Sequence, residues 1–168
     1  SKITAVIKAD GYGHGAVCIG QTLLENGADR FAVATLSEAI QLRTFFPNIE
    51  TMVLGYTPEN LALDLIKYNI IQTIYTLEQA KEFSQVAISL NKKITVHIKL
   101  DTGMNRLGMV FEDKTINTIL EISKLDGLII EGIFTHFAAA DEIDKEYTIQ
   151  QVKKFMYIIN NLEKKGLK

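Results

Sequence analysis

The chain has 168 residues, 47% of them hydrophobic and 23% charged, and its formal net charge at pH 7 is −2. This composition is typical of one soluble globular domain, and it excludes an intrinsically disordered chain. The small net charge argues against nucleic-acid and membrane partners. The one cysteine, Cys18, permits neither an internal disulfide nor a cysteine-based zinc site, so we expect no metal and a cytoplasmic location. We also expect no membrane span and no signal peptide, because no apolar run reaches the ~18–20 residues that cross a bilayer.

Six short runs rich in Ile, Val, Thr and Phe predict β-strands. These runs are Ile3–Lys8, Phe31–Ala34, Thr51–Leu54, Ile70–Ile74, Ile94–Leu100 and Leu128–Thr135. Helical patterns lie between and after them, such as the sets Ala80, Phe83, Ala87 and Leu90, and Ile149, Val152, Phe155, Met156, Ile159 and Leu162. This alternation predicts an α/β fold of parallel strands with helical crossovers.

Capping residues mark three expected helix starts. Ser37 is expected to cap the helix after the second strand. Thr57 and Pro58 are expected to form the N-cap and first-turn proline of the next helix. Thr76 and Gln79 fit a capping box.

Two closures of the sheet fit this order of elements, an open doubly wound sheet and a closed (β/α)8 barrel. Six units suit the open sheet, because a barrel needs eight units and typically ~250 residues. The fifth strand favours the barrel. Its residues Thr95, His97, Lys99 and Asp101 share one polar face, which suits a lumen that reaches a site better than a sheet covered by helices on both faces.

Residues with useful chemistry gather where the first strand ends, and α/β proteins build their sites at the carboxyl ends of parallel strands. Lys8 follows an apolar run that disfavours the charged form of a lysine. It is either a nucleophile or base, or a lysine that reaches water beyond the strand. The next loop, Asp10–Gly15, has three glycines but fits neither a P-loop nor a dinucleotide fingerprint. Tyr12 and His14 within it favour a ligand-binding loop over a flexible turn.

Two further strand ends carry polar residues. Arg106 lies in a glycine-flanked loop, where it either holds a carboxylate or phosphate or is a surface arginine. Lys99 on the preceding strand has the same charge, so it either pairs with Asp101 or has a chemically altered charge. His136 follows the sixth strand among aromatic residues, as a core histidine or a catalyst, and His97 is interpreted as structural.

Three segments together resemble the amino-terminal part of bacterial alanine racemases, which are pyridoxal-phosphate enzymes. They are AVIKADGYGHG (Ala5–Gly15), KLDTGMNRLG (Lys99–Gly108) and EGIFTHFAAADE (Glu131–Glu142), in the family's order and spacing. The segment VLGYTP (Val53–Pro58) is similar to the end of the family's third strand. The resemblance implies an eight-stranded α/β barrel followed by a β domain. On this basis residues 1–168 form a partial barrel of about six βα units, without the carboxy-terminal β domain.

The resemblance also implies roles for individual residues. Lys8 matches the lysine that binds pyridoxal phosphate covalently and then acts as one of two bases. Arg106 matches the arginine that contacts the cofactor ring oxygen and the substrate carboxylate. Tyr12 and His136 match residues beside the cofactor phosphate and the pyridine ring, and Leu54 matches an apolar pocket residue.

Lys99 matches a lysine that is often carbamylated in the family. A carbamate is an anion, so this modification would resolve the like-charge contact with Arg106 and hold the guanidinium in place.

The activity implied is the interconversion of L- and D-alanine by a homodimer, which supplies D-alanine for peptidoglycan. The second base of the family is a tyrosine in the partner's carboxy-terminal domain, so we expect this chain alone to be inactive. The alternatives are a racemase of serine or of a broader amino-acid set, another pyridoxal-phosphate protein on the same barrel, or a non-catalytic cofactor-binding or structural fragment. Unpaired edges on the first and sixth strands predict self-association.

Overall fold

Six strands form one continuous parallel sheet in a computed structural model that describes residues 1–167. The order is β1 (Thr4–Val6), β2 (Arg30–Val33), β3 (Glu50–Val53), β4 (Ile71–Ile74), β5 (Ile94–Asp101) and β7 (Leu128–Phe134). Each strand overlaps its predicted run, but the first is shorter than Ile3–Lys8. It ends at Val6, and Lys8 is the first residue of α1 (Lys8–Tyr12), a short turn with left-handed backbone angles. A two-residue strand, β6 (Met109–Val110), was not predicted and pairs with the end of β5. It is too short to show any periodicity in the sequence.

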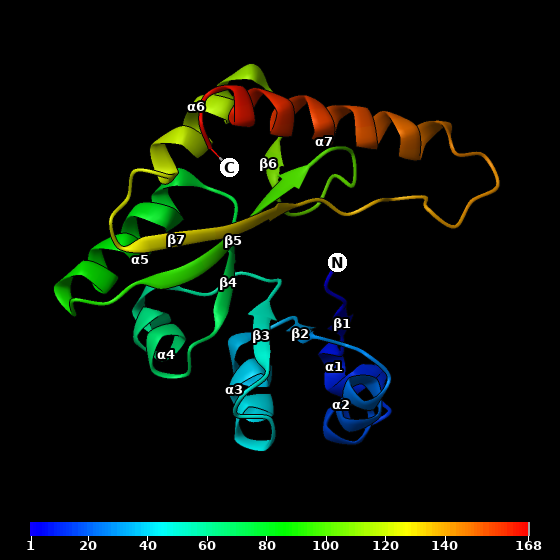
Figure 1. The fold of residues 1–168 in the computed structure, drawn as a ribbon, viewed down its shortest axis with the longest axis vertical. Coiled ribbons are helices and arrows are strands. Elements are labelled where there is room, and N and C mark those ends of the chain that lie inside the picture. Colours follow the sequence, from blue (N-terminus) through cyan, green and yellow to red (C-terminus); the bar gives the residue numbers. More distant parts are fainter. Residues whose placement is uncertain (168) are drawn as a thin grey trace.

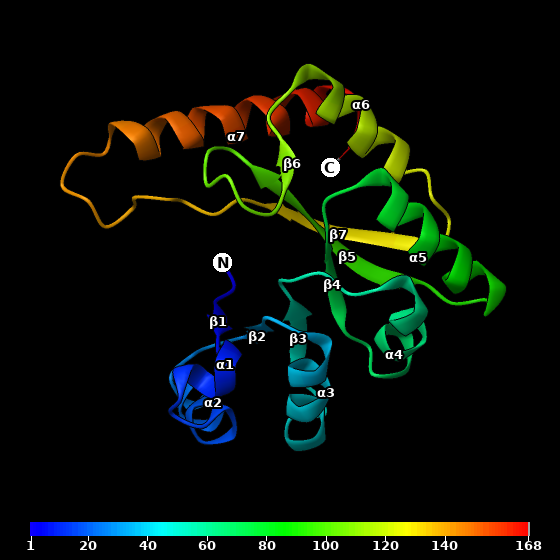
Figure 2. The same ribbon diagram turned by 180° about the vertical axis from the view of Figure 1, so that it is seen from behind.

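The helices lie around the outside of a curved sheet. Besides the short turn α1, they are α2 (Ala16–Glu25), α3 (Leu36–Phe45), α4 (Ala62–Lys67), α5 (Leu77–Ser89), α6 (Asp113–Ile122) and α7 (Glu146–Lys164), with a 3-10 turn η1 (Glu59–Leu61) before α4. Figure 1 shows the strands turning from nearly vertical in β3 to nearly horizontal in β7, and Figure 2 shows the same curvature from behind. A curved parallel sheet with helices on its outer side is part of an α/β barrel, so the barrel interpretation is confirmed over the open doubly wound sheet.

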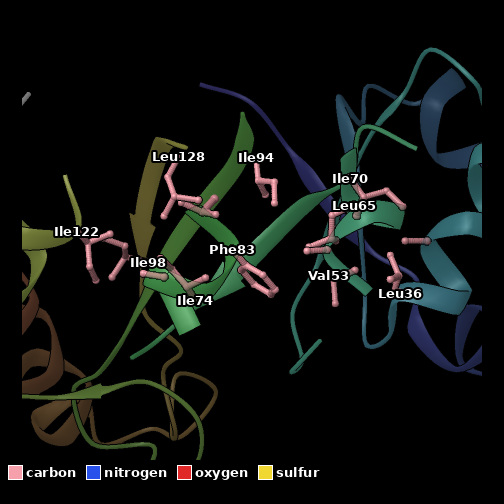
Figure 3. Packing of buried hydrophobic residues seen from close by; sticks show 14 of the residues in the cluster. Leu36, Val53, Leu65, Ile70, Ile74, Phe83, Ile94, Ile98, Ile122 and Leu128 are labelled. Atoms are coloured by element: carbon pink, nitrogen blue, oxygen red, sulfur yellow. The ribbon is translucent and has the colours of Figure 1, made fainter. Parts of the chain in front are cut away.

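The core has two parts, one on each face of the sheet. The larger lies between the sheet and the helices and includes Phe83, Ile74 and Ile98, which are fully buried (Figure 3). The smaller lies on the inner face of the sheet and consists of Ala32, Met52, Ile71 and the partly buried Leu54. The inner face is therefore apolar in its middle, and its polar residues lie at the two ends of the lumen.

The helix after β2 begins with a different cap from the one predicted. Its N-cap is Thr35, whose hydroxyl accepts from the N–H of Glu38, while the Glu38 carboxylate accepts from the N–H of Thr35. Ser37 lies inside the first turn, so the prediction for Ser37 is wrong. The reciprocal pair satisfies two backbone donors at once, whereas a cap at Ser37 offers no acidic residue three positions later.

The other two capping predictions differ in outcome. Thr76 is confirmed as the N-cap of α5, because its hydroxyl accepts from the N–H of Gln79 at 3.1 Å. The Gln79 side chain turns instead to the N–H of Tyr75. Thr57 is not a cap, since its buried hydroxyl donates to Oε1 of Gln72 on β4 at 2.6 Å. The Thr57 hydroxyl thus bonds a buried side chain from a neighbouring strand and not the backbone of the helix that follows it.

The two predicted sheet edges, β1 and β7, and the predicted last helix, α7, are present. The predicted apolar face of α7 is buried only in part. Within residues 1–167, β1 pairs only with β2, and β7 pairs only with β5. In α7, Leu162 is buried, whereas Ile149, Val152 and Met156 are 40–50% exposed. No helix in this part of the chain has both the length and the apolar character needed to cross a bilayer.

Candidate active site

One cavity of about 670 Å3 brings together the five residues assigned to cofactor and substrate and, with them, Lys99. Its lining includes Lys8, Tyr12, Leu54, Lys99, Arg106 and His136. His14, the other polar residue of the glycine-rich loop, is not among the lining residues. Lys8 and Tyr12 follow β1, and Leu54 follows β3. Lys99 lies near the end of β5, Arg106 follows that strand, and His136 follows β7. The cavity therefore opens at the carboxyl ends of the strands. Sequence reasoning did not find the small and apolar lining residues Val6, Ala32, Ala34, Met52, Gly55, Leu107 and Gly132, because nothing distinguishes them from ordinary core residues.

Lys8 and Tyr12 lie at the two ends of a left-handed turn. The backbone angles φ and ψ are 51° and 50° at Ala9 and 52° and 49° at Asp10, and φ is 55° at Tyr12. A residue with a Cβ in this conformation costs about 1–2 kcal/mol. The turn therefore forms only because surrounding contacts impose it, and strain of this kind is typical of functional sites.

Asp10 supplies one of those contacts. Its Oδ1 accepts from the N–H of Ala16, the first residue of α2, at 2.7 Å. Its carbonyl oxygen accepts from the N–H of Gly15 at 2.9 Å. The glycine-rich loop is thus folded onto the start of α2 as a defined turn, and it holds Tyr12 at the edge of the cavity.

Asp101 organises the loop that carries Arg106. Its carboxylate accepts from the backbone N–H groups of Gly103 and Asn105 at 3.0 Å and of Arg106 at 3.2 Å. Burial raises the pKa of Asp101, but these donors outweigh it and hold the pKa below its ordinary value. Lys99 donates instead to the carbonyl of Leu107 at 2.8 Å. Within residues 1–167 no ion pair joins Lys99 to Asp101, so the predicted pairing alternative is wrong.

The cavity is electrostatically positive. Lys99 is only 5% exposed, so burial lowers its pKa, and the charge of Arg106 lowers it further against the opposing effect of Asp101. Burial also lowers the pKa of His136, with additional lowering by the charges of Arg106, Lys99 and Lys8. The neutral form of His136 is therefore favoured beside three basic side chains. This arrangement suits an anionic ligand.

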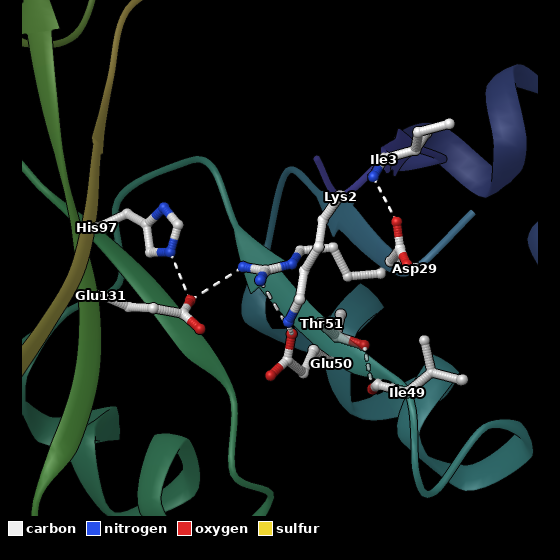
Figure 4. Close-up of polar contacts among 9 residues, drawn as sticks. Lys2, Ile3, Asp29, Ile49, Glu50, Thr51, His97 and Glu131 are labelled. Carbon is white, nitrogen blue, oxygen red and sulfur yellow. Dashed lines mark hydrogen bonds and ion pairs between the residues drawn. The ribbon is translucent and has the colours of Figure 1, made fainter. Parts of the chain in front are cut away.

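A partly buried ion cluster lies at the opposite end of the lumen. The Oε2 atom of Glu131 lies 2.6 Å from Nε2 of His97 (Figure 4) and accepts from Nη1 of Arg30 at 2.9 Å, while Nη2 of Arg30 lies 3.1 Å from Glu50. Burial raises the pKa of Glu131, but the hydrogen bonds from His97 and Arg30 outweigh it and lower the pKa overall. His97 was interpreted as structural, and its contacts support that reading, although its ring also lines the cavity.

The sheet makes room for this cluster with a local irregularity. The register between β5 and β7 shifts at Glu131, which lies between the pairs Val96–Ile130 and His97–Gly132. A Cβ at Gly132 would lie only 3.0 Å from Cε1 of His97, so the glycine leaves space for the imidazole. The sequence does not reveal this cluster, because its members come from four strands far apart in the chain.

Fold and site together define a parallel α/β barrel domain with a cationic site at the carboxyl ends of its strands. A family model described as "Alanine racemase, N-terminal domain" matches residues 1–168. The chain is 52% identical over 166 residues to an alanine racemase of Clostridium tetani, covering 99% of this chain and 43% of that protein. The chain therefore belongs to the alanine racemase family, as the resemblance of its three segments implies.

Solved structures agree with this assignment. Alanine racemase of Clostridium difficile 630 in complex with cycloserine superposes with a TM-score of 0.95 at 42% identity, covering 99% of this chain and 46% of that one. A histidine racemase of Leuconostoc mesenteroides superposes with a TM-score of 0.87 at 31% identity, covering 92% of this chain and 42% of that one. The chain thus spans less than half the length of the proteins that it matches.

Proposed function

We propose that this protein uses pyridoxal phosphate to interconvert the L and D forms of an amino acid, with alanine as the substrate. One observation carries the proposal: a single cavity brings the amine of Lys8 together with Arg106, Lys99 and His136. The names of the most similar relatives support alanine. D-Alanine supply for peptidoglycan, in the cytoplasm, is the corresponding physiological role.

The residues present fit this cofactor. Lys8 supplies an amine for covalent attachment, and the positive potential of the cavity suits the phosphate and the ring oxygen. We assign Tyr12 to the phosphate, the neutral His136 to the ring, Arg106 to the ring oxygen and Leu54 to the apolar wall. When bound, the cofactor takes up the electron pair left on the substrate Cα.

Two side chains of this chain then act on the substrate. The Nζ atom of Lys8 moves a proton to and from Cα on one face of the substrate. Arg106 binds the substrate carboxylate, because a guanidinium matches its two oxygens. Inversion needs a second proton donor on the other face. We assign it to the partner subunit of a homodimer, as the family resemblance implies, and expect no turnover by residues 1–168 alone.

We further propose that Lys99 is carbamylated. Carbamylation requires the neutral amine, and burial beside Arg106 lowers the pKa of Lys99 and so increases that form. The Nζ atom would bond to the carbon of CO2 and release one proton, which leaves an anion to hold the guanidinium. The intact mass in bicarbonate buffer, compared with the mass in CO2-free buffer, tests this assignment. A gain that persists in a Lys99→Gln variant would contradict it.

A second substrate class remains open because one similar structure is a histidine racemase. By the family resemblance, most residues that select the substrate side chain lie outside residues 1–168. A broader specificity, which includes serine, is therefore the alternative function. Calorimetric binding of alanine, serine and histidine to the chain loaded with pyridoxal phosphate distinguishes these cases without requiring turnover.

Borohydride reduction in the presence of pyridoxal phosphate tests the site itself. We expect one adduct, located on Lys8 by peptide mass and lost in Lys8→Ala. The exposed Lys92 and Lys93 report unspecific labelling within the same sample. Adducts spread equally over Lys8 and these surface lysines would contradict the proposed function.

A further inference from the structure

The carboxylate of Glu38 connects two separate loops of the barrel. Its Oε2 atom accepts from the N–H groups of Ala34 and Thr35 at 2.8 and 2.9 Å, at the end of β2. Its Oε1 atom accepts from the N–H of Ala9 at 2.6 Å, in the loop that follows β1. The two segments are 29 residues apart along the chain where Glu38 meets Ala9.

The contact with Ala9 has no part in capping the helix. A capping box needs only the exchange between Thr35 and Glu38, and that exchange is complete without Oε1. Ala9 directly follows Lys8 and is the first residue of the left-handed turn. Glu38 thus fixes the peptide group that joins Lys8 to a strained backbone.

The remaining anchors of the turn lie further along the loop. Asp10 is tied to Ala16, and the N–H groups of Gly11 and Gly13 donate to carbonyls of residues 7 and 9. These bonds close the turn upon itself and onto α2. The contact from Glu38 ties it to the neighbouring βα loop, two residues beyond the last backbone bond to β2, from Ile7 to Ala32 at 2.9 Å.

We propose that Glu38 is a positioning residue that directs the Lys8 amine into the cavity by holding the N–H of Ala9. The inference rests on the proposed function, because it concerns where the amine meets the cofactor. A misplacement of about 1 Å at a reacting group is enough to cost up to ~100-fold in rate. Glu38 does not line the cavity, and it makes none of the proposed contacts with the cofactor. It therefore acts through Lys8.

The experiment compares three variants in the full chain: Glu38→Ala, Glu38→Gln and Thr35→Val. Thr35→Val removes the capping hydroxyl but leaves the carboxylate on Ala9, so it controls for an effect on α3 alone. Glu38→Gln keeps one oxygen that can accept from Ala9. Two quantities are measured for each, the rate of borohydride-trapped adduct formation on Lys8 and the rate of amide hydrogen exchange in residues 8–13.

Thr35→Val is expected to lower the melting temperature and leave both rates unchanged. Glu38→Ala is expected to slow adduct formation and speed exchange, each by about tenfold, which is the effect of losing one hydrogen bond to a charged group. Glu38→Gln is expected to lie between Glu38→Ala and the wild type. This ordering separates positioning from simple loss of helix stability.

Equal rates in Glu38→Ala and Thr35→Val would overturn the inference. If Glu38→Ala does not fold, Glu38→Gln is read against Thr35→Val in the same way. If the wild-type chain forms no adduct on Lys8, the proposed function fails for this chain, and the exchange rates alone decide the role of Glu38. Unchanged exchange in residues 8–13 would then refute it.

Discussion

Replacing Glu131 with Gln should destabilise the fold through the ion cluster at the amino end of the lumen. The carboxylate accepts from His97 at 2.6 Å and from Arg30 at 2.9 Å through the same oxygen, and the Arg30 side chain is 9% exposed. Each hydrogen bond to a charged group contributes about 1.5–3 kcal/mol. Because Arg30 keeps Glu50, we expect a net loss of about 2–3 kcal/mol, or about 4–12 °C in melting temperature.

Urea unfolding followed by circular dichroism measures this loss, and Glu121→Gln is the matched control. Glu121 forms an ion pair of 2.9 Å with Lys81, but both side chains are about half exposed. Exposed pairs contribute about 0–1 kcal/mol, so the control should change little. If both variants lose the same free energy of unfolding, burial does not strengthen the cluster and the reasoning is wrong.

The same cluster makes a prediction about pH. The pKa of Glu131 is lower in the folded state than in the unfolded state, so its contribution is fully present above the unfolded pKa. The contribution is lost as the pH falls through the folded pKa. Stability should therefore decrease on acidification below about pH 4.5, the ordinary pKa of a glutamate, and Glu131→Gln should show a shallower decrease. An equally steep decrease in the variant would assign the acid sensitivity to other groups.

Three further outcomes are expected. Thr57→Val should cost about 1–3 kcal/mol of unfolding free energy, because it leaves buried Gln72 without its donor, whereas Ser37→Ala should cost under about 0.5 kcal/mol; equal losses by urea unfolding would contradict this. Gly132→Ala should cost about 1–3 kcal/mol by forcing the ring of His97 aside, and an unchanged midpoint would refute the tight fit. The open edges of β1 and β7 should cause concentration-dependent association in sedimentation velocity, and a single monomeric species at all concentrations would count against it.

The sequence reveals those parts of the fold that depend on local patterns. All six main strands overlap the β-branched runs that predict them, and the polar face of β5 correctly favours a barrel. The six site residues meet in one cavity because parallel strands bring their carboxyl ends to one edge. Here a local rule and a topological rule are together sufficient to predict a shared site.

The parts that the sequence does not reveal depend on tertiary partners. Thr57 matches a cap by its neighbours, but a buried glutamine from another strand binds its hydroxyl. Lys99 and Asp101 lie two residues apart on one face of β5. The Asp101 carboxylate nevertheless accepts hydrogen bonds from backbone N–H groups of the following loop and not from Lys99. Arg30 belongs to no recognisable sequence motif. Its ion pairs with Glu50 and Glu131 form only because the fold brings β2, β3 and β7 together.

The two ends of the lumen differ in how their charges are balanced, and this difference predicts which end would attract an anion. At the amino end, Arg30 is neutralised by Glu50 and Glu131. At the carboxyl end, within the part of the chain that the structure describes, no ion pair involves Lys8, Lys99 or Arg106. The positive side chains of the lumen without an ion-pair partner, Lys8, Arg106 and Lys99 in its unmodified form, therefore lie at the carboxyl end. A chain with a net charge of −2 can therefore carry a positive cleft, because the field of a cleft depends on its local charges and not on the total.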